Sequence, residues 1–488
     1  MATNRIHAFN THYEIYDYKI GENRELEKSM TYRDFQAYTS YPKYMYDSVN
    51  STLYIPRGFD PFILEQWNGK PVTIEENNSH VERIFYNMKK PPRNEDQQKA
   101  IRFLTGQREF SSMKLSPQKV LIMPPGTGKT YCAIAAIQQM AMRAMIIMHT
   151  QTLKDQWVER ISECTSMGGP NIVELKSSDQ LHGYMKKKPS PNQKIFITTR
   201  SLLISYCDRY GINALSVVLE RMGIGIKVFD EAHKEYTRTL FIDYVTNVKY
   251  TFYLTATFQL SNYGDNQVFQ RAFNIVPKLK IKSNKSAEHI IYLAVLFNSR
   301  PNTMEEMRVA KTKRGLNRHS YIAYEMEKGI LAKEVEYIMD YFINQKKMKG
   351  KSLILSPKKS SCDYFKEVGD VAVHGLQSSC SFYTGNKVDN YKHYDIISAT
   401  AQMLGTGEDI PELRFMHNTE PIASLPNTDQ FSGRLRPFYY MGEMKDTYYI
   451  EYIDIGFEKA YEWYKNREKL LKKKVKEVKV LNHVGLFN

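Results

Sequence analysis

The sequence predicts an α/β protein with two tandem domains, each built on a mostly parallel sheet, behind a small N-terminal accessory domain. Short, almost continuously apolar segments alternate with helix-like segments over two long stretches, residues 92–277 and 278–465. Strands of this composition are typical of parallel sheets that are covered on both faces. The chain has 488 residues, 42% of them hydrophobic, which is enough for more than one core.

Residues 1–91 differ from the rest of the chain in composition. They are rich in tyrosine and contain a strand-like segment, STLYIPRGF (51–59), between loop signals such as WNGKP and KKPP. They contain no phosphate-binding loop. We therefore predict an accessory domain here, with DNA binding as its expected role.

Each long stretch contains a series of predicted strands. In the first they are KVLIM (119–123), AMIIM (144–148), KIFIT (194–198), IKVFD (226–230) and YTFYL (250–254). In the second they are HIIYLAVLF (289–297), KSLILS (351–356), DIISA (395–399) and YYIEYID (448–454). Polar residues at 298–318 predict an insertion or a long surface loop.

The end of the chain, residues 466–488, is predicted to be a basic tail. The segment YKNREKLLKKKVKEVKV (464–480) favours a helix. Its lysines fit either a solvated helix face or a contact with nucleic acid, and the sequence leaves both open.

Composition limits the partners and the compartment. Lys and Arg number 68 against 53 Asp and Glu, a net charge of +15. This charge suits a polyanion such as nucleic acid, although it also fits an ordinary basic soluble protein. The five scattered cysteines predict neither a zinc ribbon nor a disulfide framework, and they fit a reducing, cytoplasmic compartment. We see no secretory leader and expect no membrane span.

The segment LIMPPGTGKTYCAI (121–134) resembles a phosphate-binding loop, but Met123 stands where the usual pattern has its first glycine. The loop follows a predicted strand and opens a predicted helix, as a phosphate cradle requires. Lys129 is suited to the β- and γ-phosphates, and the Thr130 hydroxyl to Mg²⁺. The first loop position contributes mainly backbone, so we expect Met123 to leave the site functional; a chance match in a structural loop is the alternative.

Two carboxylates, Asp230 and Glu231, follow the strand at 226–230 in the segment IKVFDEAH. Ligands of open α/β sheets bind at the carboxyl ends of the strands. Asp230 is suited to hold Mg²⁺, and Glu231 to orient and deprotonate an attacking water.

The order of four segments, PPGTGKT, FDEAH, LTATF (254–258) and QFSGRLRPF (430–438), resembles the DEAH-type helicases of superfamily 2. The similarity extends over residues 92–465. It implies two RecA-like domains with ATP and Mg²⁺ bound between them, and it implies ATP hydrolysis coupled to movement along nucleic acid.

The resemblance assigns roles residue by residue. Beside Lys129, Asp230 and Glu231, it implies Gln430, Arg434 and Arg436 as catalytic; the spacing G-R-x-R leaves both arginines as candidates for the finger. Coupling falls to Thr255 and Thr257. The nucleotide-binding residues would be Gln97, Pro125, Gly126, Thr127, Gly128, Lys129, Thr130, Gly407 and Asp409. The nucleic-acid contacts would be Thr150, Gln151, Thr199, Arg200 and Thr400.

Within the superfamily, the layout is similar to the group of the phage T4 recombination helicase, the XPB-type helicases and the poxvirus transcript-release helicase. That likeness implies a 3′-to-5′ motor on duplex, branched or single-stranded DNA, with an RNA–DNA hybrid or a transcription complex as further partners. An RNA-directed or restriction-type motor and a catalytically dead nucleic-acid-binding module are the alternatives. The sequence does not fix the oligomeric state, although a monomer is compatible with it.

Overall fold

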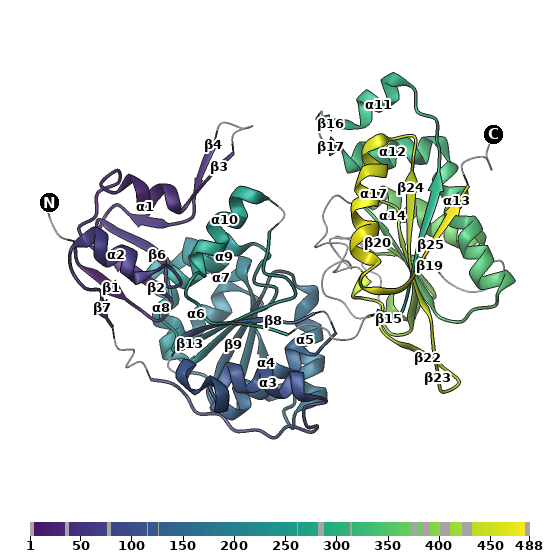
Figure 1. The fold of residues 1–488 in the computed structure, drawn as a ribbon. Coiled ribbons are helices and arrows are strands. Elements are labelled where there is room, and N and C mark those ends of the chain that lie inside the picture. The colour runs from purple at the N-terminus through teal and green to yellow at the C-terminus, as the bar shows by residue number, and fades with distance from the viewer. Residues whose placement is uncertain are drawn as a thin grey trace. The chain divides into compact units, whose positions relative to one another are not determined.

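The structure is a computed structural model, shown in Figure 1. It describes residues 4–34, 39–75, 80–114, 116–124, 126–260, 262–281, 287–312, 315–372, 379–382, 391–400, 410–421 and 432–483. The chain divides into two compact units, residues 1–282 and 283–488. Unit 1 therefore ends after the predicted boundary at 277, because β14 (Lys278–Lys280) pairs with β8 (Gln118–Ile122) inside its sheet.

Unit 1 begins with a small domain built on a five-stranded sheet, in the order β5-β6-β2-β1-β7. The predicted strand at 51–59 forms β6 (Thr52–Pro56). The other strands are β1 (Ile6–Ala8), β2 (His12–Ile15), β5 (Met45–Asp47) and β7 (Thr73–Ile74). Two helices, α1 (Arg24–Ser29) and α2 (Pro61–Asn68), and the hairpin β3 (Thr31–Asp34)–β4 (Thr39–Pro42) complete the domain.

This N-terminal domain shares a hydrophobic core with the rest of unit 1. Buried residues of its sheet, such as Leu53 and Ile55, belong to the same cluster as Phe269 and Ala272 of α10 (Tyr263–Ala272). The contact is close at Gly58, where an added Cβ would lie 2.3 Å from the Ala272 carbonyl oxygen. The predicted domains 1–91 and 92–277 are thus packed into one unit.

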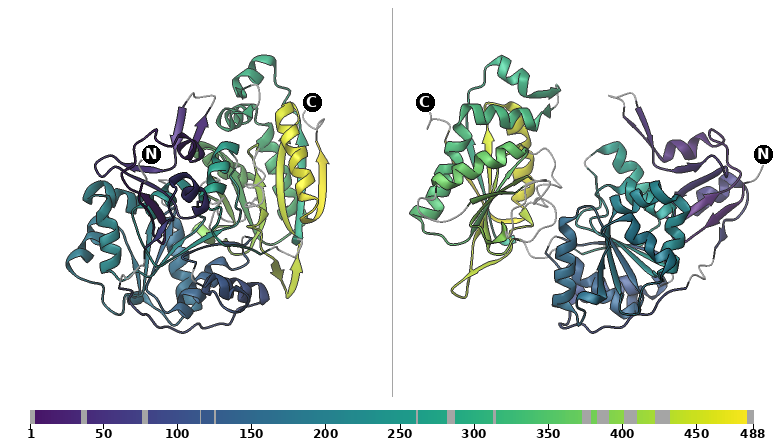
Figure 2. Two further views of the ribbon diagram at one scale, coloured as in Figure 1. Left: turned by 60° about the vertical axis from the view of Figure 1, so that its left-hand side comes forward. Right: turned by 180° about the vertical axis from the view of Figure 1, so that it is seen from behind.

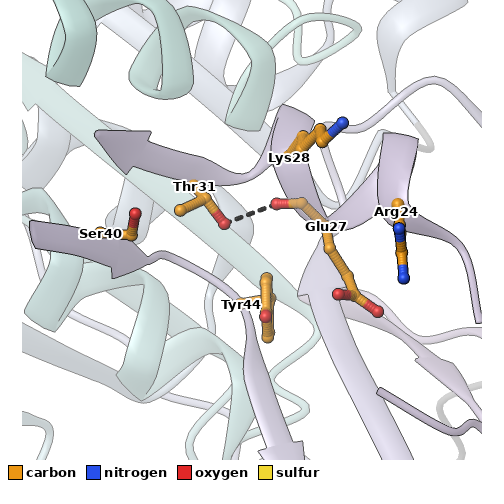
Figure 3. Close-up of a pocket in the computed structure, with 6 residues that line it drawn as sticks. All are labelled: Arg24, Glu27, Lys28, Thr31, Ser40 and Tyr44. Atoms are coloured by element: carbon orange, nitrogen blue, oxygen red, sulfur yellow. Dashed lines mark hydrogen bonds between the residues drawn. The ribbon is translucent and has the colours of Figure 1, made fainter. Parts of the chain in front are cut away.

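A pocket of about 340 Å³ lies on the N-terminal domain between α1 and the β3–β4 hairpin. Figure 3 shows its lining, which is polar and of mixed charge: Arg24, Glu27, Lys28, Thr31, Ser40 and Tyr44. The Glu27 carboxylate accepts hydrogen bonds from the Tyr18 hydroxyl at 2.8 Å and from the Gly21 N–H at 2.6 Å. The Thr31 hydroxyl donates to the Glu27 carbonyl oxygen at 2.6 Å. The carboxylate is therefore held by groups of its own domain.

The second part of unit 1 is a seven-stranded parallel sheet in the order β10-β11-β9-β12-β13-β8-β14. The five predicted strands are confirmed as β8, β9 (Ala144–Met148), β11 (Ile195–Thr199), β12 (Ile226–Phe229) and β13 (Tyr250–Thr255). The sheet also contains a short strand that we did not predict, β10 (Ile172–Glu174).

Alternate side chains of this sheet point into two separate cores, as in β8, where Val120 and Ile122 belong to one cluster and Leu121 to the other. Helices cover both faces (Figure 2). One core includes α3 (Glu95–Thr105), α4 (Lys129–Met140) and α5 (Thr152–Cys164); the other includes α6 (Ser178–Lys186), α7 (Arg200–Tyr210), α8 (Ile212–Arg221), α9 (Tyr236–Tyr244) and α10. The N-terminal domain packs on the second face.

Unit 2 is a second seven-stranded parallel sheet, in the order β19-β20-β18-β21-β24-β15-β25. Its strands are β15 (Ala287–Phe297), β18 (Lys351–Ser356), β19 (Ser379–Phe382), β20 (Ile396–Thr400), β21 (Leu413–Asn418), β24 (Thr447–Asp454) and β25 (Val475–Asn482). On one face pack α12 (Arg318–Lys328), α13 (Ile330–Met339) and α14 (Lys359–Ala372), and on the other packs α17 (Glu458–Leu471). The predicted α/β class with two parallel-sheet domains is thus confirmed.

The predicted helix at 464–480 is wrong in its second half. The helix α17 ends at Leu471, and β25 then pairs with β15 as the edge strand of the sheet. Three of its eight residues are valines, which favour extended backbone, and the strand covers the otherwise open edge of β15. The basic tail is therefore part of the second domain.

Two smaller features complete unit 2. The predicted insertion at 298–318 contains α11 (Thr303–Val309) and the short strands β16 (Ala310–Thr312) and β17 (Gly315–Leu316). A hairpin, β22 (Phe438–Tyr440)–β23 (Glu443–Lys445), precedes β24. Among the described residues of both units, no helix combines the length and apolar character needed to cross a membrane.

Candidate nucleotide site

The loop between β8 and α4 has the backbone of a phosphate cradle. Gly126 and Gly128 have φ angles of 75° and 99°, a region that side-chain-bearing residues rarely adopt. A Cβ on Gly128 would lie 2.3 Å from the Gln97 amide nitrogen, so glycine is also required by space. Lys129 and Thr130 form the first turn of α4. Pro125, which we assigned to the nucleotide, lies outside the described residues.

Gln97 holds this loop in place from α3. Its side chain is buried, with its amide nitrogen donating to the Thr127 carbonyl oxygen at 2.9 Å and its amide oxygen accepting from the Arg93 N–H at 2.9 Å. The Thr127 hydroxyl in turn donates to the Pro124 carbonyl oxygen at 2.6 Å. Gln97 thus fixes the loop, and its proposed contact with the nucleotide stays a prediction.

Met123 occupies the position where a glycine is usual. Its side chain is fully buried in the core that contains α3 and α4, and its backbone N–H donates to the Thr255 carbonyl oxygen at 3.0 Å. The side chain therefore extends into the domain interior, and only backbone remains at the strand end. This arrangement explains how the loop tolerates methionine.

Two carboxylates face the loop from the end of β12. The Lys129 ammonium lies 3.0 Å from Glu231 Oε1, and both side chains remain slightly exposed, at 11% and 15%. Asp230 is fixed by the Trp157 indole N–H at 2.9 Å and by the Glu231 N–H at 2.9 Å. Burial, reinforced by the neighbouring Glu231, raises the pKa of Asp230. A cation is therefore favoured at this carboxylate.

The segment LTATF connects to the carboxylates through His233. His233 Nδ1 lies 2.7 Å from the Thr255 hydroxyl and 3.4 Å from Glu231 Oε2. The Thr255 hydroxyl itself donates to the Thr257 carbonyl oxygen, so His233 is the donor toward Thr255. Burial lowers the pKa of His233 to about 4, which keeps the ring neutral at physiological pH. Thr255 thus lies one hydrogen bond from the carboxylate loop, and Thr257 is connected to that loop through Thr255.

The structure corrects one predicted nucleic-acid contact. Arg200 is fully buried, and its guanidinium donates to the carbonyl oxygens of Asp230 and Glu231 at 2.8 and 3.4 Å. Its side chain is thus directed into the domain, where the carbonyl oxygens of the carboxylate loop accept its hydrogen bonds and the carboxylates of Glu235, Asp230 and Glu231 oppose the effect of burial on its pKa. Thr199 is also buried, and its hydroxyl caps α7 by accepting from the Leu202 N–H at 3.3 Å.

The remaining predicted residues lie at strand ends. Thr150 and Gln151 follow β9 and precede α5, where Gln151 is exposed; Thr400 ends β20 and is half-buried. Arg434 and Arg436 are half-buried in unit 2. Gly407, Asp409 and Gln430 lie outside the described residues, so their roles stay predictions.

Sequence analysis did not single out Trp157 or His233. Trp157 is one of three tryptophans and lies in HTQTLKDQW, which we read only as a backbone-contact loop. A buried indole can satisfy its N–H only with a nearby acceptor, and the carboxylate at the end of β12 supplies it. His233 was visible in FDEAH, and its bond to Thr255 required the fold.

Comparison with known proteins finds similarity in the first parallel-sheet domain. Residues 90–260 match the family model of the type III restriction enzyme res subunit. A proposed ATP-dependent RNA helicase of Acanthamoeba polyphaga mimivirus is 28% identical over 126 residues, which are 25% of this chain and 24% of that protein. The proposed DNA 3′-5′ helicase Rad25 of Halobacterium salinarum is 27% identical over 114 residues, which are 23% of this chain and 16% of that protein.

The chain therefore covers less than a quarter of the length of each of these relatives. Among solved structures, S. cerevisiae Dbp5 bound to RNA and ADP BeF3 has a TM-score of 0.50 at 13% identity, covering 80% of this chain and 94% of that one. This likeness concerns the fold alone. Residues 90–260 are thus similar to the restriction-subunit family model, and both relatives are described as helicases, in agreement with the resemblance.

Proposed function

We propose that this chain is an ATP-dependent helicase or translocase that acts on duplex or branched DNA with 3′-to-5′ direction. The observation that carries the proposal is the pair formed by Lys129 at the start of α4 and Glu231 after β12, 3.0 Å apart at the carboxyl edge of the sheet. The pair is slightly exposed, so a phosphate can replace the carboxylate as the partner of Lys129. Glu231 would then be free to activate water.

The residues around this pair fit a Mg²⁺–ATP complex. The Gln97 side chain leaves no room for a side chain at Gly128, and a glycine backbone lets main-chain N–H groups approach a phosphate closely. Lys129 would hold the β- and γ-phosphates, while Thr130 and Asp230 would hold Mg²⁺. ATP supplies the phosphoryl group that is transferred to water. Gln430, Arg434 and Arg436 stay our candidates for stabilising the charge of that group.

The names of the relatives support two substrates. The Halobacterium protein is described as a DNA 3′-5′ helicase and the mimivirus protein as an RNA helicase. The net charge of +15 fits either polyanion. We favour DNA, with a role in transcript release, recombination or repair in a reducing compartment such as the bacterial cytosol, a virion or a viral factory.

The proposal is tested by ATPase assays with single-stranded DNA, duplex DNA, branched DNA and RNA as stimulants, together with strand displacement on substrates that carry a 3′ or a 5′ tail. We expect the largest stimulation with DNA and displacement from the 3′ tail. The Lys129→Ala protein serves as the negative control in both assays. No ATP turnover with any of the four nucleic acids would leave the chain as a binding module.

An RNA-directed or restriction-type motor is the second candidate. It is favoured by the descriptions of the matching family and of the mimivirus relative. Stronger stimulation by RNA than by any form of DNA would support the RNA-directed version. Stimulation that depends on one DNA sequence would support the restriction type.

A further inference from the structure

The pocket on the N-terminal domain, between α1 and the β3–β4 hairpin, lies outside the nucleotide site. Its volume of about 340 Å³ falls within the range of about 300–1,000 Å³ that is common for small-molecule sites. None of its lining residues belongs to the loop between β8 and α4 or to the carboxylate loop after β12. The pocket is therefore a separate candidate site, and the chemistry of its lining indicates which ligand it would take.

The walls of the pocket are fixed to the parallel-sheet domain of unit 1. In the hairpin, the Tyr32 hydroxyl accepts a hydrogen bond from the Asn262 side-chain amide at 2.9 Å, and a Cβ added to Gly264 would lie 2.5 Å from the Tyr32 ring. At the end of α1, the Ser29 carbonyl oxygen accepts from the Arg271 guanidinium at 2.9 Å. These contacts preform the pocket, and a preformed site loses little conformational entropy when a ligand binds.

Two cations of α1, Arg24 and Lys28, line the pocket from successive turns of one helix face. Both residues are exposed. In the described part of the N-terminal domain, the ion pairs join Arg5 to Asp17, His7 to Glu75, His12 to Glu14 and Lys43 to Asp265. Neither pocket cation takes part in such a pair within those residues, so both charges are available to a ligand.

Glu27 is the acidic residue of the lining. Its Oε1 already accepts hydrogen bonds from the Tyr18 hydroxyl at 2.8 Å and from the Gly21 N–H at 2.6 Å. These donors compensate part of its charge. With two cations and one carboxylate, the lining carries a net positive charge and favours an anion as the ligand.

The hydroxyl groups of Ser40 and Tyr44 add two neutral donors to the lining. Within the described residues neither hydroxyl makes a hydrogen bond, whereas the Thr31 hydroxyl already donates to the Glu27 carbonyl oxygen. Burial, followed by the nearby Glu27 carboxylate, raises the pKa of Tyr44, so its hydroxyl keeps its proton and can donate. The pocket thus offers a guanidinium, an ammonium and two hydroxyls to one ligand.

We propose that this pocket binds a phosphate group, carried either by a free nucleotide or by the backbone of a nucleic acid. A guanidinium can donate two parallel hydrogen bonds to phosphate oxygens, and the ammonium and the hydroxyls supply further donors to the same group. A carboxylate has only two oxygens and would leave part of this donor set unused. The proposal does not depend on ATP hydrolysis, because the lining shares no residue with the nucleotide site.

The test removes the two cations together in Arg24→Gln/Lys28→Gln. The matched control is Arg5→Gln/Lys70→Gln, which removes the same two kinds of charge from exposed positions of the same domain outside the pocket. Isothermal titration calorimetry with inorganic phosphate, AMP and acetate, and fluorescence anisotropy with a short oligodeoxythymidine, measure binding to the whole chain. Every titration is carried out in the Lys129→Ala background, which removes the predicted phosphate contact of the nucleotide site. Thermal unfolding checks that each variant folds.

We expect Arg24→Gln/Lys28→Gln to weaken the binding of inorganic phosphate at least about tenfold, whereas the control should change it less than about threefold. A loss of the same size for AMP would identify a free nucleotide as the source of the phosphate. A loss for the oligonucleotide without one for AMP would identify a nucleic-acid backbone. Tyr44→Phe removes one donor without a change of charge, so it should give a smaller loss, of about threefold.

Glu27→Gln should have the opposite effect and strengthen phosphate binding at least about threefold. The substitution removes the negative charge and keeps an acceptor for the Tyr18 hydroxyl and the Gly21 N–H. A damaged pocket would only weaken binding, so a gain in affinity distinguishes a local site from a loss of folding. If Arg24→Gln/Lys28→Gln does not fold, Glu27→Gln and Tyr44→Phe decide the question through their opposite expected signs.

Three outcomes overturn the proposal. Phosphate binding that falls equally in the pocket variant and in the control would be an effect of overall charge. Acetate that binds as tightly as phosphate, and is lost in the same variant, would make the pocket a site for carboxylates. Failure of the Lys129→Ala chain to bind phosphate, AMP or the oligonucleotide would leave the pocket without this ligand. By contrast, a wild-type chain that hydrolyses no ATP would refute the proposed function and leave the phosphate site standing.

Discussion

Unit 1 contains two lysine–carboxylate pairs at β12 that share a chemistry and differ in burial. Lys129–Glu231 lies at the carboxyl edge, with the side chains 11% and 15% exposed. Lys227–Asp243 lies inside the sheet-facing core, with the side chains 0% and 2% exposed and the atoms 2.7 Å apart. A ligand can reach the Lys129–Glu231 pair and replace one partner, which makes this pair exchangeable. The Lys227–Asp243 pair is closed to solvent, and we call it the sealed pair. Burial, rather than pairing, separates a functional ion pair from a structural one.

Both residues of the sealed pair have further hydrogen-bond partners. Lys227 donates to the Thr246 hydroxyl at 2.5 Å, and Asp243 accepts from the Tyr253 hydroxyl at 2.6 Å. Burial lowers the pKa of Lys227 and raises the pKa of Asp243, and each partner opposes that shift in the other. The network continues to Gln118, which donates to Tyr253, and so joins β8, β12, β13 and α9. This hydrogen-bond network therefore serves to hold the fold together.

The largest effect is expected when the sealed pair is broken. Lys227→Met leaves an uncompensated buried carboxylate and should lower the free energy of unfolding by about 3–5 kcal/mol. The double variant Lys227→Met/Asp243→Leu should recover much of that loss, because no charge remains unpaired. Denaturant unfolding measures both. Equal losses in the single and double variants would mean that the pair itself stabilises the fold.

Breaking the Lys129–Glu231 pair should lower ATP turnover and leave the stability of the fold nearly unchanged. Lys129→Ala removes a phosphate contact, so we expect kcat/KM for ATP to fall at least about a hundredfold while the free energy of unfolding changes by less than about 1 kcal/mol. Glu231→Gln should still bind ATP and hydrolyse it poorly. Steady-state ATPase and nucleotide titration distinguish the two variants. Wild-type turnover in Glu231→Gln would exclude its role in water activation.

Met123 sharpens the comparison, since it precedes the loop that carries Lys129 and yet its side chain is fully buried. Met123→Ala should lower the free energy of unfolding by about 2–5 kcal/mol, because it leaves a cavity in the core. Affinity for ATP should change less than about tenfold, or about 1.4 kcal/mol. A larger loss of affinity with little loss of stability would mean that the side chain shapes the loop.

The smallest expected effect is the pH dependence of stability that arises from His417, a buried residue of unit 2. Burial lowers the pKa of His417 to about 3, so the folded protein excludes a proton that the unfolded chain binds below about pH 6.5. Stability should therefore fall with decreasing pH between about 6.5 and 3, with a slope of up to about 1.4 kcal/mol per pH unit from this residue. His417→Phe should flatten the slope measured by denaturant unfolding at pH 5 to 6.5. An unchanged slope would exclude His417 as its source.

The sequence predicted most strands and the local motifs, because both depend on neighbouring residues. Apolar runs such as AMIIM at 144–148 formed strands almost residue for residue. The prediction missed β10, which has three residues, and β21, whose segment LRFMHN contains arginine and histidine. Runs this short or this polar carry no periodic signal, and the neighbouring strands of the sheet define them.

The site was predictable in its residue types and not in the direction of its side chains. The prediction for Arg200 came from the family resemblance, which gave no information on which way the guanidinium turns. The direction is set by the carbonyl oxygens of Asp230 and Glu231, thirty or more residues away along the chain. Long-range hydrogen bonds of this kind cannot be read from local sequence.

The packing of the N-terminal domain on unit 1 has a consequence for biosynthesis. The Asn10 N–H bonds to the Asn247 side chain, 237 residues further along the chain. The N-terminal domain is synthesised before the last helices of unit 1, so apolar residues that pack against those helices stay uncovered until the helices have been made. Such delayed partners slow folding and expose nascent chains to aggregation. A chaperone that shields the emerging N-terminal sheet should therefore raise the yield of folded protein.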